Sequence, residues 1–244
     1  QILTKYWGFT SFKPLQEDII RSVADGKDTL GLMPTGGGKS ITFQVPALAH
    51  EGICLVITPL IALMKDQVAR LNSLEIRSIA IHSGMSGEEI DNALENAIYG
   101  DYKFLYVSPE RISTRVFQGK VSRFNLSLVV IDEAHCISEW GHDFRPEYRR
   151  IRPIIEAIGQ NVPIMALTAT ATLKVQQDIQ KNLGILDADV FKSSFNRPNL
   201  YYEVKSKQDV TKEIIKYIKN NAGKSGIIYC LSRKKVEEIA EVLK

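Results

Sequence analysis

Short apolar runs rich in β-branched residues alternate with longer amphipathic stretches along most of the chain. The apolar runs predict buried strands, at Thr29–Met33, Ile53–Thr58, Ser78–Ile81, Phe104–Val107, Leu128–Ile131 and Ile164–Thr168. The amphipathic stretches predict helices, at Gln16–Ala24, Ala62–Asn72, Gly87–Tyr99 and Leu173–Leu183. This alternation predicts βαβ units, and therefore an α/β fold with a mainly parallel sheet flanked by helices. Ligands of such sheets bind at the carboxyl ends of the strands.

A polar pause at Phe191–Asn199 separates this pattern from a shorter one. The shorter pattern predicts two strands and two helices, in the order Tyr201–Val204, Asp209–Lys219, Gly226–Cys230 and Arg233–Leu243. Its length, about forty residues, is too small for a complete α/β domain. We therefore expect one domain over residues 1–200 and the incomplete start of another over residues 201–244.

Composition places few limits on function. The net charge of +3 and the pI near 8.6 permit a nucleic-acid partner without favouring one. Cys54, Cys136 and Cys230 lie far apart and not at C-x-x-C spacing, so we expect neither a zinc site nor a disulfide framework. Reduced thiols in a cytoplasmic protein are the simplest account. No run of about 18 apolar residues occurs, so no membrane-spanning helix is expected.

The strand expected at Thr29–Met33 leads directly into the glycine-rich sequence Pro34–Ser40, which a helical stretch follows. Strand, glycine loop and helix form the context of a phosphate-binding loop, where backbone N–H groups and a helix N-terminus face the phosphate. Lys39 would reach the β- and γ-phosphates of a nucleotide, and the Ser40 hydroxyl would ligate Mg²⁺. The nucleotide contacts expected from the loop are Thr35, Gly36, Gly37, Gly38, Lys39 and Ser40. Met33 replaces the first glycine of the general motif, and the alternative is a glycine-rich turn with a surface lysine.

An acidic pair follows a later strand, since Leu128–Ile131 ends on Asp132-Glu133-Ala134-His135. A carboxylate at the end of a buried strand, near a phosphate loop, is suited to hold Mg²⁺, so Asp132 would bind the metal through water. Glu133 would polarise the attacking water as general base, and His135 would sense the γ-phosphate. A strand that simply ends in solvated charge is the alternative, and the upstream glycine loop argues against it.

Together the two motifs resemble those of superfamily 2 helicases, and the finer match, over essentially all 244 residues, resembles the RecQ family of DNA helicases. The resemblance implies a RecA-like P-loop NTPase lobe followed by the start of a second RecA-like lobe. It implies ATP and Mg²⁺ as cofactors, and single-stranded and duplex DNA as partners. It also implies 3′-to-5′ translocation, duplex unwinding, and a place in DNA repair and recombination at a bacterial nucleoid or in a nucleus. The oligomeric state stays open.

The sequence Trp7–Gln16 resembles the adenine-recognition motif of this family. The resemblance implies that Gln16 contacts the adenine edge, which suits an amide with both a donor and an acceptor. It also implies that Phe9 and Lys13 hold the ring between them. The family usually has arginine at the position of Lys13, and lysine lacks the flat guanidinium that stacks on a base. The residues alone favour an amphipathic helix with Gln16 on its solvent face.

The aromatic-rich sequence Cys136–Tyr148 resembles the loop with which RecQ helicases sense single-stranded DNA and signal to the ATPase site. Aromatic rings stack on unpaired bases, and arginine binds phosphate or base. The DNA contacts expected here are Trp140, His142, Phe144 and Arg145. The alternative is that the aromatic residues pack a helix against the sheet, and for Tyr148 we favour that alternative.

Two further segments, Thr58–Gln67 and Ser108–Arg111, resemble the family's motifs that follow a DNA strand. Both come directly after predicted strands, so both are expected at the ligand-binding edge of the sheet, where helix N-termini and backbone amides would bind DNA phosphates. Ordinary strand-to-helix loops would explain the same residues. Leu167–Ala171 resembles a hinge that hydrogen-bonds near the acidic pair and relays nucleotide state, and Thr170 or Thr172 would also cap the following helix.

Gly226–Cys230 with Ser232 and Arg233 resembles the opening motif of the second lobe, which in the family supplies an arginine to the γ-phosphate. No arginine follows Arg233 in this chain. Because such an arginine is worth about 10³–10⁵ in rate, we expect these residues to bind ATP or ADP, to hydrolyse ATP very poorly and not to unwind DNA.

Two rival hypotheses stay open at this point. One is an RNA helicase of the same superfamily, against which the aromatic-rich sequence and the Trp-Gly-Phe motif argue. The other is a non-motor protein that uses an ATP-binding fold as a switch. Intact Lys39, Asp132 and Glu133 argue against the switch, because a binding module does not need a catalytic carboxylate.

Overall fold

A computed structural model describes residues 1–34, 36–158, 161–169, 171–194 and 199–243 of the chain. The chain divides into two units, Gln1–Asn196 and Arg197–Lys244, and each is described by itself. The expected nucleotide-site residues all belong to the first unit.

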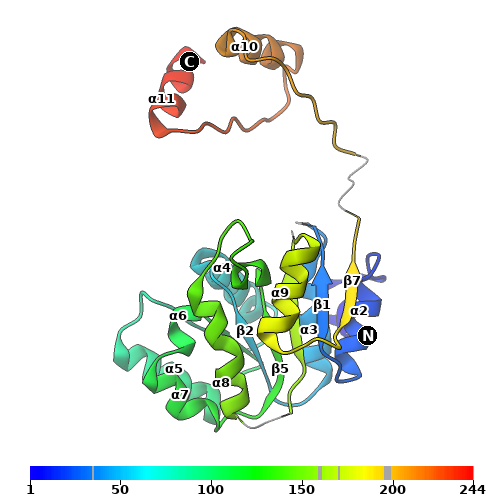
Figure 1. Cartoon of the computed structure of the whole chain (residues 1–244), viewed down its shortest axis with the longest axis vertical. Coiled ribbons are helices and arrows are strands. Elements are labelled where there is room, and N and C mark those ends of the chain that lie inside the picture. The colour runs from blue at the N-terminus through cyan, green and yellow to red at the C-terminus, as the bar shows by residue number, and fades with distance from the viewer. Residues whose placement is uncertain (35, 159–160, 170, 195–198, 244) are drawn as a thin grey trace. The chain divides into compact units, whose positions relative to one another are not determined.

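Seven strands form the sheet of the first unit in the order β3-β4-β2-β5-β6-β1-β7. Figure 1 labels β2, β5, β1 and β7 among them. The strands are β1 (Thr29–Leu32), β2 (Ile53–Ile57), β3 (Ser78–Ile81), β4 (Phe104–Val107), β5 (Leu126–Ile131), β6 (Ile164–Thr168) and β7 (Asp189–Lys192). Each neighbouring pair is parallel. Because β6 lies between β5 and β1, the carboxyl ends of these three strands lie side by side at the same end of the sheet.

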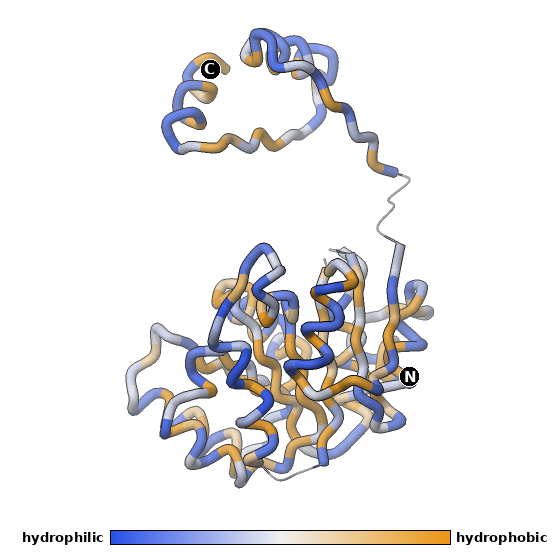
Figure 2. The backbone as a smooth tube through the Cα atoms, in the orientation of Figure 1, coloured by the Kyte–Doolittle hydropathy of each residue, from blue (hydrophilic) through white to orange (hydrophobic). Residues whose placement is uncertain are grey.

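Alternate residues of each central strand enter two hydrophobic layers, one on each face of the sheet. In β5, Val129 and Ile131 belong to one layer, whereas Leu128 and Val130 belong to the other. Hydrophobic colour follows the strands through the middle of the unit in Figure 2. A sheet covered on both faces needs apolar residues at nearly every strand position, which explains the short apolar runs in the sequence.

Helices cover both faces. One layer contains side chains from α2 (Gln16–Ala24), α3 (Lys39–Ala49) and α4 (Ile61–Ser73). The other layer contains side chains from α5 (Gly87–Tyr99), α6 (Pro109–Ile112), α7 (Arg115–Val121), α8 (Ile151–Ile158) and α9 (Leu173–Leu183). A short first helix, α1 (Ile2–Trp7), packs through Leu3 on Ile20 and Val45. Two 3₁₀ helices, η1 (Ala134–Ile137) and η2 (Pro146–Arg150), lie between β5 and α8.

The strands and helices predicted within the first unit form within two residues of the expected bounds. The expected pause is wrong at its start, because Phe191 and Lys192 belong to β7. That strand lies at the edge of the sheet, and its residues alternate between half-buried and exposed. An edge strand of this kind has no continuous apolar run to predict it.

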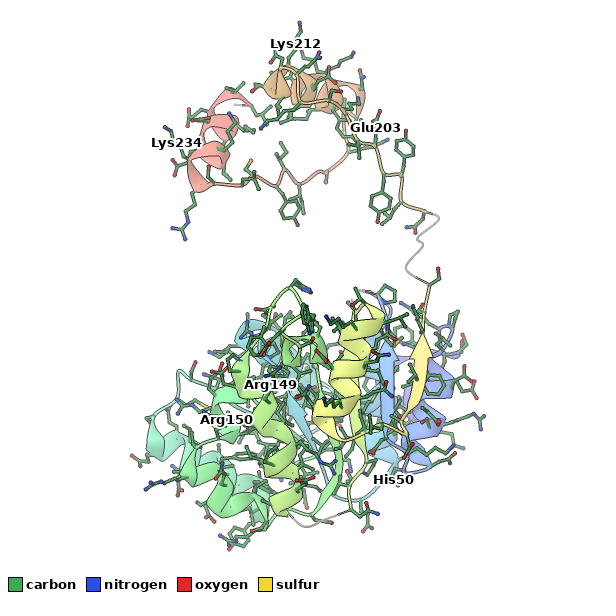
Figure 3. The ribbon with its side chains drawn as sticks, in the orientation of Figure 1. His50, Arg149, Arg150, Glu203, Lys212 and Lys234 are labelled. Atoms are coloured by element: carbon green, nitrogen blue, oxygen red, sulfur yellow. The ribbon has the colours of Figure 1, made fainter. Side chains whose placement is uncertain are left out.

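The second unit contains two helices, α10 (Val210–Asn220) and α11 (Arg233–Val242). The strands predicted at Tyr201–Val204 and Gly226–Cys230 are wrong, because neither segment forms a strand. A strand needs neighbouring strands for its N–H and C=O groups and a packed layer for its side chains, and two short segments provide neither. Charged side chains of this unit, such as those of Glu203, Lys212 and Lys234, are exposed (Figure 3).

Within the described ranges, no helix combines the length and the apolar composition needed to cross a membrane.

We expect Gly52→Ala to destabilise the first unit. Gly52 precedes β2 with a φ of 93°, and a Cβ added there would lie 2.6 Å from the backbone oxygen of Asn125. That oxygen accepts the N–H of Ile53 at 2.7 Å, so the contact relaxes only by loosening the pairing of β2 with β5. Backbone strain of this kind costs about 1–3 kcal/mol in the free energy of unfolding, which urea denaturation followed by circular dichroism would measure.

Gly119→Ala is the matched control for this variant. Gly119 lies inside α7, and an added Cβ meets nothing within 4 Å. Because alanine favours a helix over glycine by up to about 1 kcal/mol, the control should be slightly stabilised. Equal stabilities of the two variants would contradict the account of Gly52.

Candidate nucleotide and DNA site

Two glycines in the left-handed conformation shape the phosphate loop between β1 and α3. Gly36 has a φ of 80° and Gly38 a φ of 79°, where a larger residue is strained. The Gly37 N–H donates to the Pro34 carbonyl at 2.9 Å, which closes a tight turn. The helix then begins at Lys39. Strand, turn and helix are therefore assembled as the sequence predicts.

Gln16 connects the second helix to this loop. Its side chain is buried, and its amide N–H donates to the carbonyls of Gly38 at 3.1 Å and Gly37 at 3.4 Å. Its amide oxygen accepts the Lys13 N–H at 2.8 Å, and the Lys13 ammonium donates to the Gly36 carbonyl at 3.1 Å. The solvent-facing position that the residues alone favoured for Gln16 is therefore wrong, because backbone groups of the loop and of Lys13 occupy the amide.

Asp132 follows β5 and is held on several sides. Its N–H donates to the Ile57 carbonyl at 2.9 Å, which extends the pairing of β5 with β2. The Thr58 hydroxyl donates to one carboxylate oxygen at 3.5 Å, and the Glu133 N–H donates to the other at 3.0 Å. Burial and the neighbouring Glu133 raise the pKa of Asp132 to about 6, although Lys39 opposes them. A desolvated carboxylate in this state is stabilised by an added cation.

Glu133 lies between a lysine and a histidine. Its Oε1 is 3.7 Å from Lys39 Nζ, and its Oε2 is 3.3 Å from His135 Nδ1. The same His135 nitrogen lies 2.9 Å from the Thr168 hydroxyl of β6. Burial lowers the pKa of His135, so its ring is neutral at pH 7, and a hydrogen on Nδ1 suits both oxygens. The acidic pair is thereby connected to the neighbouring strand.

The backbone of Glu133 is in the left-handed region, with a φ of 50° and a ψ of 44°. A non-glycine residue there costs about 1–3 kcal/mol and persists only where the surroundings impose it. This turn ends β5 sharply and begins η1, which directs the carboxylate back toward the phosphate loop.

An exposed ring, Trp140, and a half-buried one, Phe144, follow η1. Trp140 is 63% exposed, and the Lys174 ammonium of α9 lies 2.9 Å from its ring centroid. The Arg149 guanidinium, labelled in Figure 3, lies 5.1 Å from the Phe144 ring centroid. Both rings therefore present a face to cations at the surface, where a base would also stack.

The other expected DNA contacts are engaged within the protein. His142 stacks on His135, with ring centroids 4.3 Å apart and an interplanar angle of 16°. Arg145 forms an ion pair with Asp143 at 3.2 Å. The aromatic segment is thus in contact with the residue that touches Glu133 and Thr168.

Tyr148 has a packing role, as favoured from the sequence. Its side chain is fully buried, and its hydroxyl donates to the Asp132 carbonyl at 2.9 Å. A second anchor holds the same segment to α9, where the buried Ser138 hydroxyl donates to Asp178 at 2.7 Å. These contacts fix the backbone on both sides of Trp140.

The strand-following motifs divide between two roles. Pro59 and Leu60 lie beside the acidic pair, whereas the Arg111 guanidinium donates to the carbonyls of His82 at 3.2 Å and Ser83 at 2.9 Å. Arg111 therefore holds the loop between β3 and α5 in this structure.

A cavity of about 320 Å³ opens where these segments meet. Its walls combine the first strand-following motif, the acidic pair, the aromatic segment and the end of β6, through Pro59, Leu60, Glu133, His135, His142, Asp143 and Ala169. Segments that are distant in sequence thus share one hollow at the carboxyl edge of the sheet, as such folds favour.

The segment after β6 contacts the acidic-pair region and caps the next helix, while its expected role as a relay of nucleotide state stays a prediction. Thr168 contacts His135, and the Thr172 hydroxyl caps α9 by accepting the Val175 N–H at 3.4 Å. Thr170 lies outside the described residues.

Sequence reasoning missed three partners in this site. Thr58 belonged to a recognised motif, but its contact with Asp132 depends on the pairing of β2 with β5. Asp143 stood inside the aromatic segment without an assigned role. Lys174 gave no signal at all, since only the packing of α9 brings it onto Trp140.

The residues present fit ATP and Mg²⁺. The left-handed glycines open the loop at a helix N-terminus, and Lys39 has Glu133 as an anionic neighbour where a phosphate would bind. Asp132 is a half-buried carboxylate with a raised pKa, which a cation would stabilise. Ser40 is the second residue of α3. Phe9 is 53% exposed and free to stack on a base. Thr35 lies outside the described residues.

The DEAD/DEAH box helicase family matches residues 13–179. The chain belongs to this family. It is 43% identical over 243 residues to ATP-dependent DNA helicase RecQ of Haemophilus influenzae, across 100% of this chain and 39% of that protein. RecQ of Bacillus subtilis is 43% identical, across 100% of this chain and 41% of that protein. The resemblance to RecQ helicases is therefore confirmed, and the chain spans less than half the length of these relatives.

Solved structures show the fold of this helicase lobe independently. The DUF1998 helicase MrfA bound to DNA and AMPPNP matches 98% of this chain and 36% of its own, with a TM-score of 0.74 and 19% identity. The Hef helicase domain of Pyrococcus furiosus matches 93% of this chain and 51% of its own, with a TM-score of 0.58 and 19% identity. The expected RecA-like architecture is confirmed.

We expect Asp132→Asn to stabilise the metal-free helicase lobe at neutral pH. The pKa of about 6 in the folded state exceeds the unfolded value of about 3.9. The folded state therefore binds the proton more tightly, so stability falls as the pH rises from about 4 to about 6 and stays lower above it. In EDTA at pH 7.5, the variant should gain up to about 3 kcal/mol in the free energy of unfolding, and the gain should vanish toward pH 4.

Asp143→Asn is the control, because the folded state lowers the pKa of Asp143 whereas it raises the pKa of Asp132. The hydrogen bond from Arg145 holds the pKa of Asp143 below its usual range, so the ionised form contributes stability above the unfolded pKa and loses it as the pH falls. This variant should show no stabilisation at pH 7.5. A pH-independent gain in Asp132→Asn would contradict the assigned cause.

Proposed function

We propose that this chain is the ATP-binding lobe of a DNA helicase that couples ATP hydrolysis to 3′-to-5′ movement along single-stranded DNA and to duplex unwinding. One observation carries the proposal: a contact chain runs from Lys39 through Glu133 and His135 to Thr168, and His142 stacks on it. It joins the phosphate loop to β6 and to the aromatic segment. Relatives named ATP-dependent DNA helicase RecQ support the same activity.

The chemistry we assign to the site is proton transfer by Glu133. Its Oε1 faces Lys39, while its Oε2 stays with His135. Once Lys39 turns to the phosphates, Oε1 is free to accept a proton from the attacking water. Asp132 and Ser40 would hold Mg²⁺, which supplies charge neutralisation at the phosphate oxygens.

Adenine recognition is assigned to the first helices. Gln16 joins the Lys13 backbone to the carbonyls of Gly37 and Gly38, so an adenine bound beside Gln16 is at a defined distance from the phosphate loop. The exposed ring of Phe9 would stack on the base.

DNA binding is assigned to the aromatic segment. A base stacked on Trp140 replaces Lys174 at the ring, and a phosphate bound to Arg145 replaces Asp143. Release of Asp143 changes the cavity wall that it shares with His142 and Glu133. DNA occupancy would in this way reach the general base through direct contacts.

We expect the 244-residue chain to bind ADP and ATP but to turn ATP over slowly. Without an arginine from a closing lobe, its rate should lie about 10³–10⁵ below that of a complete helicase. Fluorescence anisotropy with a labelled ADP measures binding, and phosphate release measures turnover. Lys39→Ala should lose affinity, whereas Glu133→Gln should keep it and lose the residual turnover. Rapid turnover or duplex unwinding by this chain would overturn the expectation.

We expect Trp140→Ala to weaken the binding of single-stranded DNA. Stacking of one base on an aromatic ring is worth about 1–3 kcal/mol, which anisotropy of a labelled oligonucleotide would detect. Tyr99→Ala is the matched control, because Tyr99 is a 73% exposed ring at the end of α5, outside the site. An equal loss in both variants would remove the DNA role from Trp140, and tighter binding of an RNA of matched sequence would favour an RNA helicase.

A further inference from the structure

Three unlike metal-binding side chains meet beside the acidic pair: His135, Cys136 and Asp143. Their donor atoms all lie within 4.8 Å of one another. The Cys136 sulfur lies 3.8 Å from His135 Nε2 and 3.7 Å from Asp143 Oδ2. Two of these residues belong to η1, and the third comes from the aromatic segment, so the fold creates the cluster.

The two spacings from Cys136 match a tetrahedral zinc site. With bonds of about 2.3 Å to sulfur and 2.0–2.2 Å to nitrogen or oxygen, zinc holds a thiolate about 3.6 Å from each of its other ligands. Both measured distances from Cys136 are within a few tenths of an ångström of that value. A small inward movement of side chains would complete the coordination.

The tautomer of His135 suits a metal ligand. Its Nδ1 faces Glu133 Oε2 at 3.3 Å and the Thr168 hydroxyl at 2.9 Å, so the hydrogen belongs on Nδ1 and the lone pair on Nε2 is available. A histidine that binds a metal through one nitrogen usually donates the other N–H to a carboxylate. Glu133 occupies that supporting position.

The type of ion that the cluster would bind follows from its access to the cavity and from its sulfur and nitrogen donors. His135 and Asp143 both line the cavity of about 320 Å³, which gives an ion a route in and room for a water as fourth ligand. A thiol and an imidazole favour zinc and similar ions over Mg²⁺, which prefers oxygen. The cluster is therefore chemically distinct from the Mg²⁺ position expected at Asp132 and Ser40.

We propose that His135, Cys136 and Asp143 form a binding site for a borderline-soft divalent cation, with Zn²⁺ the best fit, and that its occupancy inhibits the ATPase. Binding replaces the thiol proton of Cys136 with the metal and releases that proton to solvent. Burial raises the pKa of this thiol to about 12, so the exchange has a cost that the metal must overcome. The spacing of the cysteines in the sequence gives no sign of this site, because a single cysteine contributes to it.

Inhibition follows from the shared residues. A metal on Nε2 makes the Nδ1–H of His135 a stronger hydrogen-bond donor to Glu133, so the carboxylate becomes a weaker base toward the attacking water. The same metal takes Asp143 from its ion pair with Arg145. Both ends of the proposed DNA-to-ATP contact chain are then fixed by one ion.

The test is a titration of the reduced chain with Co²⁺ in excess Mg²⁺, which fills oxygen-rich sites. Co²⁺ bound to the cluster should give a near-ultraviolet thiolate charge-transfer band, and Zn²⁺ should displace it. Cys136→Ser should lose the band, whereas Cys230→Ser, which removes a half-buried thiol of the second unit, should keep it. No band in the unmodified chain, or an unchanged band in Cys136→Ser, would overturn the proposal.

Asp143→Asn keeps the test decisive if Cys136→Ser fails to fold. Asp143 is exposed, so its replacement leaves the core intact. Loss of a ligand should weaken Co²⁺ binding at least tenfold, since even supporting residues are worth about 10–100-fold in metal affinity. Glu133→Gln should weaken it within that range. Unchanged affinity in Asp143→Asn would exclude it as a ligand and overturn the three-residue site.

Discussion

The parallel pairing of β6 between β1 and β5 is the constraint on which the site depends. In register, Leu32 pairs with Thr168, and Ile131 pairs with Ala166. Parallel strands end at the same edge, so the phosphate loop after β1 and the acidic pair after β5 emerge on either side of Thr168. The packing of specific side chains into the two hydrophobic layers favours this register, because a one-residue slip would exchange the side chains of the two layers.

Given that register, the acidic pair is held in a costly state. Burial disfavours the Asp132 carboxylate, and the Glu133 backbone is in a left-handed conformation. Tyr148 and Thr58 maintain the arrangement through their hydrogen bonds to Asp132. Such costs are typical of functional sites, where a ligand later supplies the missing charge.

His135 is the residue that the other functional groups share. One ring nitrogen serves Glu133 and Thr168, the ring face carries His142, and the second nitrogen approaches Cys136. The proposed general base, the aromatic segment and the proposed metal cluster therefore share one side chain. Under the proposed function, this side chain would connect the nucleotide and the DNA by direct contact, with no long-range path.

The sequence by itself determined the six buried strands, the phosphate loop and the acidic pair, because each is a local pattern of apolar runs or adjacent functional residues. It also predicted the packing role of Tyr148. Tertiary structure alone decided the edge strand β7, the buried position of Gln16 and the contact of Lys174 with Trp140. It also decided that 201–204 and 226–230 are not strands. These features depend on partners distant in the chain, and periodicity along one segment carries no information about what that segment meets.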